Sequence, residues 1–235
     1  MNIKLSNRLM AVAKQVDRDA KVADIGTDHG YLAVYLTINN ISDYVIASDR
    51  AKGPLASATQ LVELLSLNTK IETRLGDGLD VLQPGEVDTI CIAGMGGMTM
   101  IDILKAHPEV VKSAKKLILQ PQRGASKVRR YLMEIGMKIT MEDVAEDDGF
   151  YYVMMVAEHG KMELTEEEIA FGPYLLKNSH PLHCDMLTLK RRDLEQLLIS
   201  LADGNSQDLQ ERKAQLQAEI AKIDEVIQQL KEKSQ

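Results

Sequence analysis

Short apolar runs alternate with longer amphipathic segments along the first 160 residues. The apolar runs favour seven β-strands, at residues 21–25, 44–48, 70–75, 88–93, 116–120, 138–144 and 151–157. Helical patterns lie between them, at residues 30–39, 54–65, 99–106 and 126–135. Strands that alternate with helices form a mostly parallel sheet covered on both faces, so the pattern predicts an α/β fold.

The last two predicted strands are separated only by the residues AEDDGF. This connection is too short for a crossover helix, so the two strands should pair antiparallel. A dinucleotide-binding Rossmann domain would be expected to continue in parallel units to its end. A Rossmann-like seven-stranded sheet with one antiparallel strand instead resembles the class I S-adenosylmethionine-dependent methyltransferase fold.

Residues 161–235 follow another pattern, with leucine and isoleucine at heptad spacing. These positions are Leu187, Leu194, Leu198, Leu201, Leu209, Leu216, Ile220, Ile223, Ile227 and Leu230. The segment ADGNSQD at 202–208 interrupts them, which predicts an α-helical antiparallel coiled-coil hairpin. We therefore expect a first domain at 1–160 and a helical domain at 161–235. Three roles are compatible with the hairpin: binding RNA, docking on the first domain or dimerisation.

Composition narrows the class of protein. No apolar run approaches the roughly 20 residues that span a bilayer, and the charged N-terminus is no signal peptide, so we expect a cytoplasmic protein without a membrane partner. The net charge of −7 argues against general nucleic-acid binding, DNA included, unless a local basic patch reverses it. Cys91 and Cys184 lie far apart and are expected as reduced thiols. His180, His183 and Cys184 lack a second ligand pair at zinc-finger spacing, so no metal is predicted.

The segment KVADIGTDHGYLAVYL at 21–36 reads as a strand, a glycine turn and a helix. It lacks the G-x-G-x-x-G of nicotinamide dehydrogenases. Asp24, Gly26 and Gly30 match the D/E-x-G-x-G-x-G pattern of class I methyltransferases, with Asp28 in place of the middle glycine. The glycines permit a tight turn and a close approach of the backbone to a ligand. The alternative is an ordinary turn in which Asp28 caps the helix.

Two more acidic residues stand at strand ends. Asp49 ends the second strand and can accept hydrogen bonds from ribose hydroxyls, while Asp77 follows the third strand, where the methyltransferase class contacts the adenine edge. Either residue alone is also compatible with a loop-capping aspartate. Together with Asp24 they fall at one edge of the sheet, which is where open α/β sheets bind ligands.

The fourth strand ends in CIAGMGGMTM, without the [D/N/S]-P-P-[Y/F] of enzymes that methylate exocyclic amines of nucleic acids. Its glycines expose backbone instead. Together, LSNRL (5–9), ADIGTDHGYL, GDGL, IAGMGG and LILQPQ resemble the bacterial tRNA (adenine(22)-N(1))-methyltransferase family, over residues 1 to about 160.

The resemblance implies S-adenosyl-L-methionine as cofactor, tRNA as partner and ring N1 of adenine 22 as methyl acceptor. Ring N1 has its own lone pair, so positioning and stabilisation of the cationic product should dominate catalysis. The expected catalytic groups are Asp28, Gly94, Met95 and Gly96. The expected cofactor-binding residues are Arg8, Asp24, Gly26, Thr27, His29, Gly30, Tyr31, Asp49, Arg50, Asp77, Gly78 and Ala93.

Between Lys112 and Lys138, eight basic residues stand against one acid, Glu134. This local reversal of sign suits phosphate neutralisation, although basic runs more often form a solvated helix face. The expected RNA-binding residues are Lys112, Lys115, Arg123, Lys127, Arg129, Arg130, Lys190, Arg191 and Arg192. Two alternatives stay open: a small-molecule methyltransferase with an enclosed pocket, and a non-catalytic RNA-binding module without cofactor affinity. The oligomeric state is open between a monomer and a weak dimer.

Overall fold

The structure, a computed structural model, describes residues 3–201 and 207–233 of the 235-residue chain. The chain divides into two compact units, Met1–Tyr174 and Leu175–Gln235. Residues 161–174, which the sequence analysis assigned to the helical domain, belong to the first unit. Their helix α7 (Glu166–Phe171) packs on helix α6 (Ala125–Glu134).

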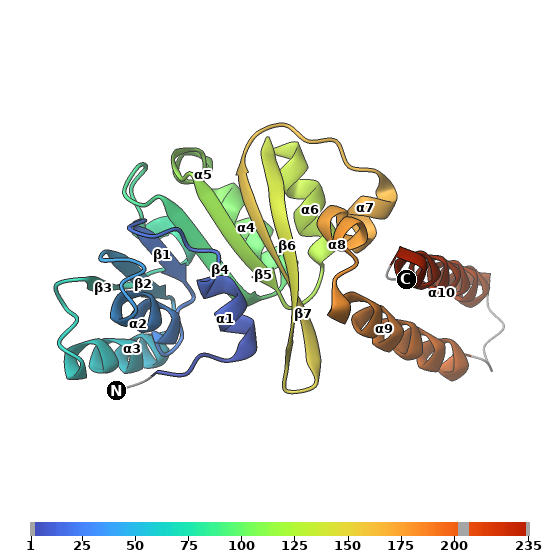
Figure 1. The fold of residues 1–235 in the computed structure, drawn as a ribbon, viewed down its shortest axis with the longest axis horizontal. Coiled ribbons are helices and arrows are strands. Elements are labelled where there is room, and N and C mark those ends of the chain that lie inside the picture. Colours follow the sequence, from blue (N-terminus) through green and yellow to red (C-terminus); the bar gives the residue numbers. More distant parts are fainter. Residues whose placement is uncertain (1–2, 202–206, 234–235) are drawn as a thin grey trace. The chain divides into compact units, whose positions relative to one another are not determined.

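The first unit is built on a seven-stranded sheet in the order β3-β2-β1-β4-β5-β7-β6 (Figure 1). Its strands are β1 (Val22–Ile25), β2 (Val45–Asp49), β3 (Ile71–Leu75), β4 (Thr89–Met95), β5 (Lys116–Pro121), β6 (Met137–Asp147) and β7 (Phe150–His159). Strands β1 to β5 pair parallel, and β7 pairs antiparallel with both β5 and β6. The predicted sheet with one antiparallel strand is therefore confirmed.

Helices cover both faces of the sheet. The chain winds from β1 to β3 in one direction and from β4 to β6 in the other. Right-handed crossovers then place α2 (Tyr31–Ile38) and α3 (Lys52–Leu64) on one face, and α4 (Gly97–Ala106) and α6 on the other (Figure 1). The sequence pattern does not predict two short helices, α1 (Asn7–Ala13) and α5 (Pro108–Ser113), because six or seven residues show too little periodicity.

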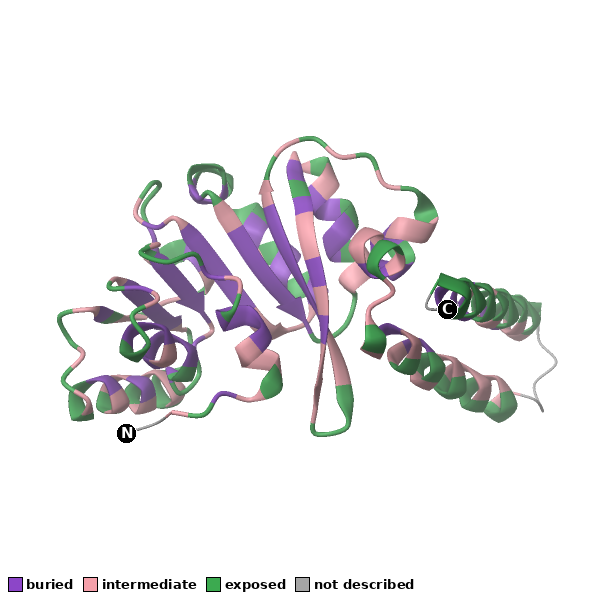
Figure 2. Cartoon of the chain, in the orientation of Figure 1, coloured by how far each residue is buried: buried purple, intermediate pink, exposed green. Residues whose placement is uncertain are grey.

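The central strands form the core. All four residues of β1 are buried, and Figure 2 shows the same for most of β2, β4 and β5. Val22, Val45, Cys91 and Ile118 pack together across these four strands. Cys91 and Cys184 are both free thiols.

The β6–β7 hairpin is longer than predicted. Pairing continues to Asp147 and Phe150, leaving only Asp148 and Gly149 in the turn. Both turn residues have positive φ, 52° and 80°, which suits the tight two-residue turns of β-hairpins. An Asp-Gly turn lets the strands pair up to the turn, so AEDDGF is mostly strand.

The second unit contains α9 (Pro181–Ser200) and α10 (Gln207–Lys233), preceded by α8 (Pro173–Asn178) across the division. The predicted heptad positions Leu187, Leu216, Ile223, Ile227 and Leu230 are buried. Helices α9 and α10 pack against each other, and Nζ of Lys233 at the end of α10 donates to the Leu176 carbonyl at 3.0 Å, as expected of an antiparallel pair. Residues 202–206 of the predicted turn lie outside the described residues.

Candidate active site

A cavity of about 480 Å³ opens at the carboxyl ends of β1 to β4. The strand order reverses between β1 and β4, and open α/β sheets bind ligands at such a point. The sequence-predicted residues that line the cavity are Arg8, Asp24, Gly26, Thr27, Asp28, Tyr31, Asp49, Arg50, Asp77, Gly78, Ala93, Gly94, Met95 and Gly96. The fold thus brings the predicted cofactor and catalytic residues to one place.

Two predicted cofactor residues do not line this cavity. His29 is half exposed, and its ring lies 5.7 Å from the ring of Tyr31. Gly30 is buried at the start of α2 with φ 75°, and a Cβ there would approach the Cβ of Ala58 to 3.0 Å. The glycine at position 30 therefore serves helix packing and backbone conformation.

The turn after β1 is fastened to β2. The amides of Gly26 and Thr27 both donate to the carbonyl of Ser48, at 2.9 and 2.8 Å. Gly26 has φ 74°, a left-handed conformation that favours glycine, whereas the nearby Cε of Met95 is the end of a flexible side chain that could move away from a Cβ. Asp28 also has a positive φ, 55°, which aspartate tolerates better than most residues.

Asp49 is held by two backbone amides. Its Oδ1 accepts the amide of Ala51 at 2.8 Å, and its Oδ2 accepts the amide of Asp28 at 3.2 Å. Each carboxylate oxygen retains capacity for another hydrogen bond. The side chain is therefore fixed in place and still able to bind two hydroxyls in the cavity.

Asp24 lies deeper in the same cavity. Burial raises the pKa of its carboxyl from 3.8 to about 6, and the nearby Asp49 adds to this; the Thr27 hydroxyl and Arg8 act in the opposite direction. Oγ1 of Thr27 donates to Asp24 Oδ2 at 2.6 Å. A cationic ligand group in the cavity would favour the ionised carboxylate.

The three glycines at the carboxyl end of β4 and just after it have different roles. A Cβ on Gly94 would lie 3.1 Å from Nη1 of Arg8, and a Cβ on Gly97 would lie 2.7 Å from the carbonyl oxygen of Gly124. At Gly96 the nearest atom is Oγ1 of Thr99 at 3.9 Å. Only Gly96 leaves room for a ligand, whereas Gly94 and Gly97 accommodate other parts of the chain.

Sequence reasoning missed Gln120 at the end of β5. Its Oε1 accepts Nη1 of Arg8 at 2.8 Å and the amide of Gly94 at 3.1 Å. The Gln120 side chain is 1% exposed, and its Nε2 has no hydrogen-bond partner among the described residues; Oγ of Ser48 is likewise buried without one. A polar residue that ends an apolar strand was the available signal. Ser48 lines the cavity, so its hydroxyl suits a polar ligand, because an unpaired buried polar group costs about 1–3 kcal/mol.

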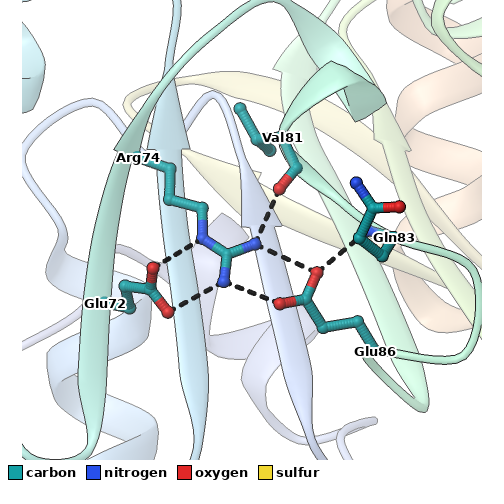
Figure 3. A network of polar contacts seen from close by, with 5 residues as sticks. All are labelled: Glu72, Arg74, Val81, Gln83 and Glu86. Atoms are coloured by element: carbon teal, nitrogen blue, oxygen red, sulfur yellow. Dashed lines mark hydrogen bonds and ion pairs between the residues drawn. The ribbon is translucent and has the colours of Figure 1, made fainter.

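The loop that carries Asp77 is braced by Arg74 (Figure 3). The Arg74 guanidinium binds the carboxylates of Glu72 and Glu86 and donates to the Val81 carbonyl at 2.7 Å. Hydrogen bonds from Arg74 hold the pKa values of both glutamates below their usual range. The network fastens the connection from β3 to β4 on the adenine side of the predicted site.

The comparisons with known proteins agree with this geometry. The family model TrmK, described as tRNA (adenine(22)-N(1))-methyltransferase, matches residues 22–225. The chain belongs to the TrmK family. It is 38% identical to the tRNA (adenine(22)-N(1))-methyltransferase of Bacillus subtilis (strain 168) over 184 residues, which is 76% of this chain and 77% of that one.

Two solved TrmK-like structures carry the cofactor or its product. The Streptococcus pneumoniae relative in complex with S-adenosyl-L-methionine is 32% identical with a TM-score of 0.88, covering 95% of this chain and 100% of that one. The M. capricolum TrmK in complex with S-adenosyl-homocysteine is 29% identical with a TM-score of 0.83, covering 96% of this chain and 99% of that one.

The prediction that Arg129 binds RNA is wrong, because its side chain is buried. Arg129 is 1% exposed; its Nε binds Oε1 of Glu142 at 2.6 Å, and its Nη1 donates to the carbonyls of Ile169 and Ala170 at 3.0 and 3.3 Å. This buried ion pair joins α6 to β6 and α7. The sequence shows the basic run but not the carboxylate that folds against one of its members.

The other predicted RNA-binding residues of the TrmK chain lie in three places. Lys112 and Lys115 precede β5, at the edge of the sheet opposite the cavity, and Lys115 pairs with Asp88 at 2.8 Å. Arg123, Lys127 and Arg130 follow β5, on the side of the cavity. In the second unit, Lys190 pairs with Glu219 and Arg191 with Asp224, and Arg192 is exposed.

Within the described parts of the chain, no cluster of three metal-ligating side chains occurs. Across those same residues, no helix is long and apolar enough to cross a membrane.

Proposed function

We propose that this TrmK-family chain transfers a methyl group from S-adenosyl-L-methionine to ring N1 of adenine 22 in tRNA. The observation that carries the proposal is the cavity at the strand reversal, where Asp24, Asp49 and Asp77 meet a glycine loop with open space at Gly96. The family match and the cofactor complexes of the related structures support it.

The residues of the cavity fit this cofactor. Asp49 would bind the ribose hydroxyls, because two backbone amides already fix its carboxylate. Asp77 would contact the adenine edge, beside the apolar side chain of Ile103. Arg8 and the buried Asp24 supply opposite charges for the zwitterionic amino-acid end. Bound S-adenosyl-L-methionine supplies an electrophilic methyl group on a positively charged sulfur.

Catalysis by the chain's own residues would consist of positioning and charge stabilisation. Ring N1 of adenine has a lone pair, so no side chain has to remove a proton before the methyl group is accepted. The backbone at Gly94, Met95 and Gly96 would hold the base edge, and the open space at Gly96 admits it. The carboxylate of Asp28, which lines the cavity, would stabilise the positive charge of the methylated ring.

The test is methylation of unmodified tRNA with labelled S-adenosyl-L-methionine, followed by mapping of the methylated base. We expect one methyl group, on N1 of adenine 22. The control is the same tRNA with guanine at position 22, which should accept none. Methylation of free adenosine at a comparable rate, or of another tRNA position, would contradict the proposal.

A further inference from the structure

A second hollow, of about 460 Å³, lies between α4 and α6. We call it the α4–α6 groove. Its floor contains the buried apolar side chains of Ile101, Tyr131 and Ile169. Its rim carries the exposed cations Lys105, Lys127 and Arg130. An apolar floor with a basic rim suits a ligand with flat, apolar parts and negative charges.

The groove begins beside the proposed active site. Met98, 49% exposed on the first turn of α4, lines the groove, while Gly96, two residues earlier, lines the cofactor cavity. The loops before α4 and α6 are joined, since the Gly97 amide donates to the Arg123 carbonyl at 2.8 Å. An extended ligand that leaves the cavity past Gly96 would therefore reach the groove next.

The charges of the groove are only partly neutralised. Arg130 pairs with Glu166 at 2.7 Å on the surface, and Glu134 is the acid in the lining. Nζ of Lys105 lies 5.3 Å from the centre of the Tyr131 ring, an aromatic and not an anionic partner. In the described residues no carboxylate is recorded within ion-pair distance of Lys105 or Lys127. On a chain of net charge −7, this surface favours a polyanion.

We propose that the α4–α6 groove binds the RNA strand that flanks the target adenosine, with phosphates on Lys105 and Lys127 and a neighbouring nucleotide over the apolar floor. The inference rests on the proposed function, since the strand is that of the tRNA substrate. An adenine inside a folded RNA must leave its stack, at a cost of a few kcal/mol, before its N1 reaches the cavity. Contacts to the flanking strand offset part of that cost.

The experiment compares two double charge reversals in the full chain. Lys105→Glu/Lys127→Glu alters the groove. Lys14→Glu/Lys161→Glu is the control with the same change of charge. Both lysines are exposed and lie at the opposite edge of the sheet, because Lys14 is next to Gln15, whose carbonyl accepts a hydrogen bond from the start of β5, and Lys161 follows the end of β7 that pairs there. Full-length unmodified tRNA is titrated by filter binding at several salt concentrations. Methylation of the same tRNA and S-adenosyl-L-methionine affinity are measured alongside.

The groove variant should bind tRNA at least tenfold more weakly than the control variant. Its slope of log affinity against log salt should be smaller by about 1.5, as expected for two lost phosphate contacts. Its affinity for S-adenosyl-L-methionine should equal that of the unaltered protein, which also shows that it is folded. Suppose that the unaltered chain methylates tRNA but the two variants have equal tRNA affinities and equal salt slopes. That result would overturn the groove assignment and leave the proposed function intact. If the unaltered chain does not methylate tRNA, the proposed function fails and the groove assignment with it.

Discussion

Nη1 of Arg8 donates a hydrogen bond to Oε1 of Gln120 at 2.8 Å, across 112 positions of the sequence. The same oxygen accepts the amide of Gly94 at 3.1 Å. The Arg8 guanidinium also lies 5.7 Å from the centre of the Tyr152 ring. The buried side-chain amide of Gln120 therefore ties α1, β5 and the carboxyl end of β4 together beside the cofactor cavity.

Replacing Gln120 by leucine should lower kcat/KM for tRNA methylation at least tenfold. The change leaves the Arg8 guanidinium and the Gly94 amide without their acceptor, and an unpaired buried donor costs about 1–3 kcal/mol. Gln120→Glu keeps an acceptor beside Arg8 and should retain more activity than Gln120→Leu. Steady-state kinetics, with S-adenosyl-L-methionine affinity by calorimetry, check this. A leucine variant with unchanged kinetics would show that Gln120 positions nothing the reaction needs.

Asp49→Ala should raise the dissociation constant for S-adenosyl-L-methionine at least tenfold, or about 1.4 kcal/mol. The reason is the loss of the proposed ribose contacts and of the acceptor for the Ala51 and Asp28 amides. Asp43→Ala is the matched control, because Asp43 is a surface residue that pairs with Lys70. Calorimetry on both variants is the measurement, and equal affinities for the two would refute the ribose assignment.

Asp28 should act on the rate of methyl transfer more than on cofactor binding. Asp28→Ala would add backbone strain at φ 55°, so Asp28→Asn and Asp28→Gly are the cleaner changes. We expect both to lower kcat at least tenfold while changing cofactor affinity less than threefold, because the carboxylate faces the charge that develops on the base. Single-turnover kinetics measure the rate. A loss confined to cofactor affinity would make Asp28 a binding or capping residue.

The ligand-free protein should lose stability through Asp24 as the pH rises from about 4 to about 6. The pKa of this carboxyl is about 6 in the folded chain against 3.8 for the free side chain. The folded state therefore binds the proton more tightly, and stability is highest below the unfolded pKa. The loss should amount to about 3 kcal/mol, at 1.36 kcal/mol for each unit of pKa.

Asp24→Asn removes this titration and preserves an acceptor for the Thr27 hydroxyl. Urea unfolding at pH 4 to 8 should show the free energy of unfolding of the wild-type protein falling relative to that of the variant across this window. A constant difference between the two proteins would mean that folding does not raise the pKa of Asp24.

A chain cut after Tyr174 should fold and bind S-adenosyl-L-methionine but lose at least tenfold in tRNA methylation. The cavity residues all precede this point, while the second unit offers additional surface for RNA. Circular dichroism, calorimetry and a methylation assay check the three parts. If the shortened chain methylates tRNA as well as the full chain, the helical pair has another role, such as dimerisation.

A cut at 163 provides the comparison. It removes the carbonyls of Ile169 and Ala170 from Arg129, and the amide of Tyr174 from Glu142. Arg129 and Glu142 would stay paired but would lose these backbone hydrogen bonds and the packing of α7, so the shorter chain should melt below the chain cut after Tyr174. Equal melting temperatures would show that α7 adds nothing to the first unit.

The sequence by itself determined the sheet and the location of the site. Apolar runs and helical periods report which face of each element is buried, and that information is local. The short connection before Phe150 required an antiparallel pair, whatever the rest of the fold. Asp24, Asp49 and Asp77 could be placed together because the carboxyl ends of parallel strands meet at one edge.

Only the tertiary structure decided the partners of the polar groups. Arg129 belongs to a basic run, but β6 brings Glu142 against it and buries both. Gly94 and Gly97 make room for Arg8 and for the backbone at Gly124. The physical reason is that a hydrogen bond or a close approach depends on atoms from distant segments. Those atoms come into contact only when the whole sheet and its helices are assembled, so a local sequence pattern does not predict the contact.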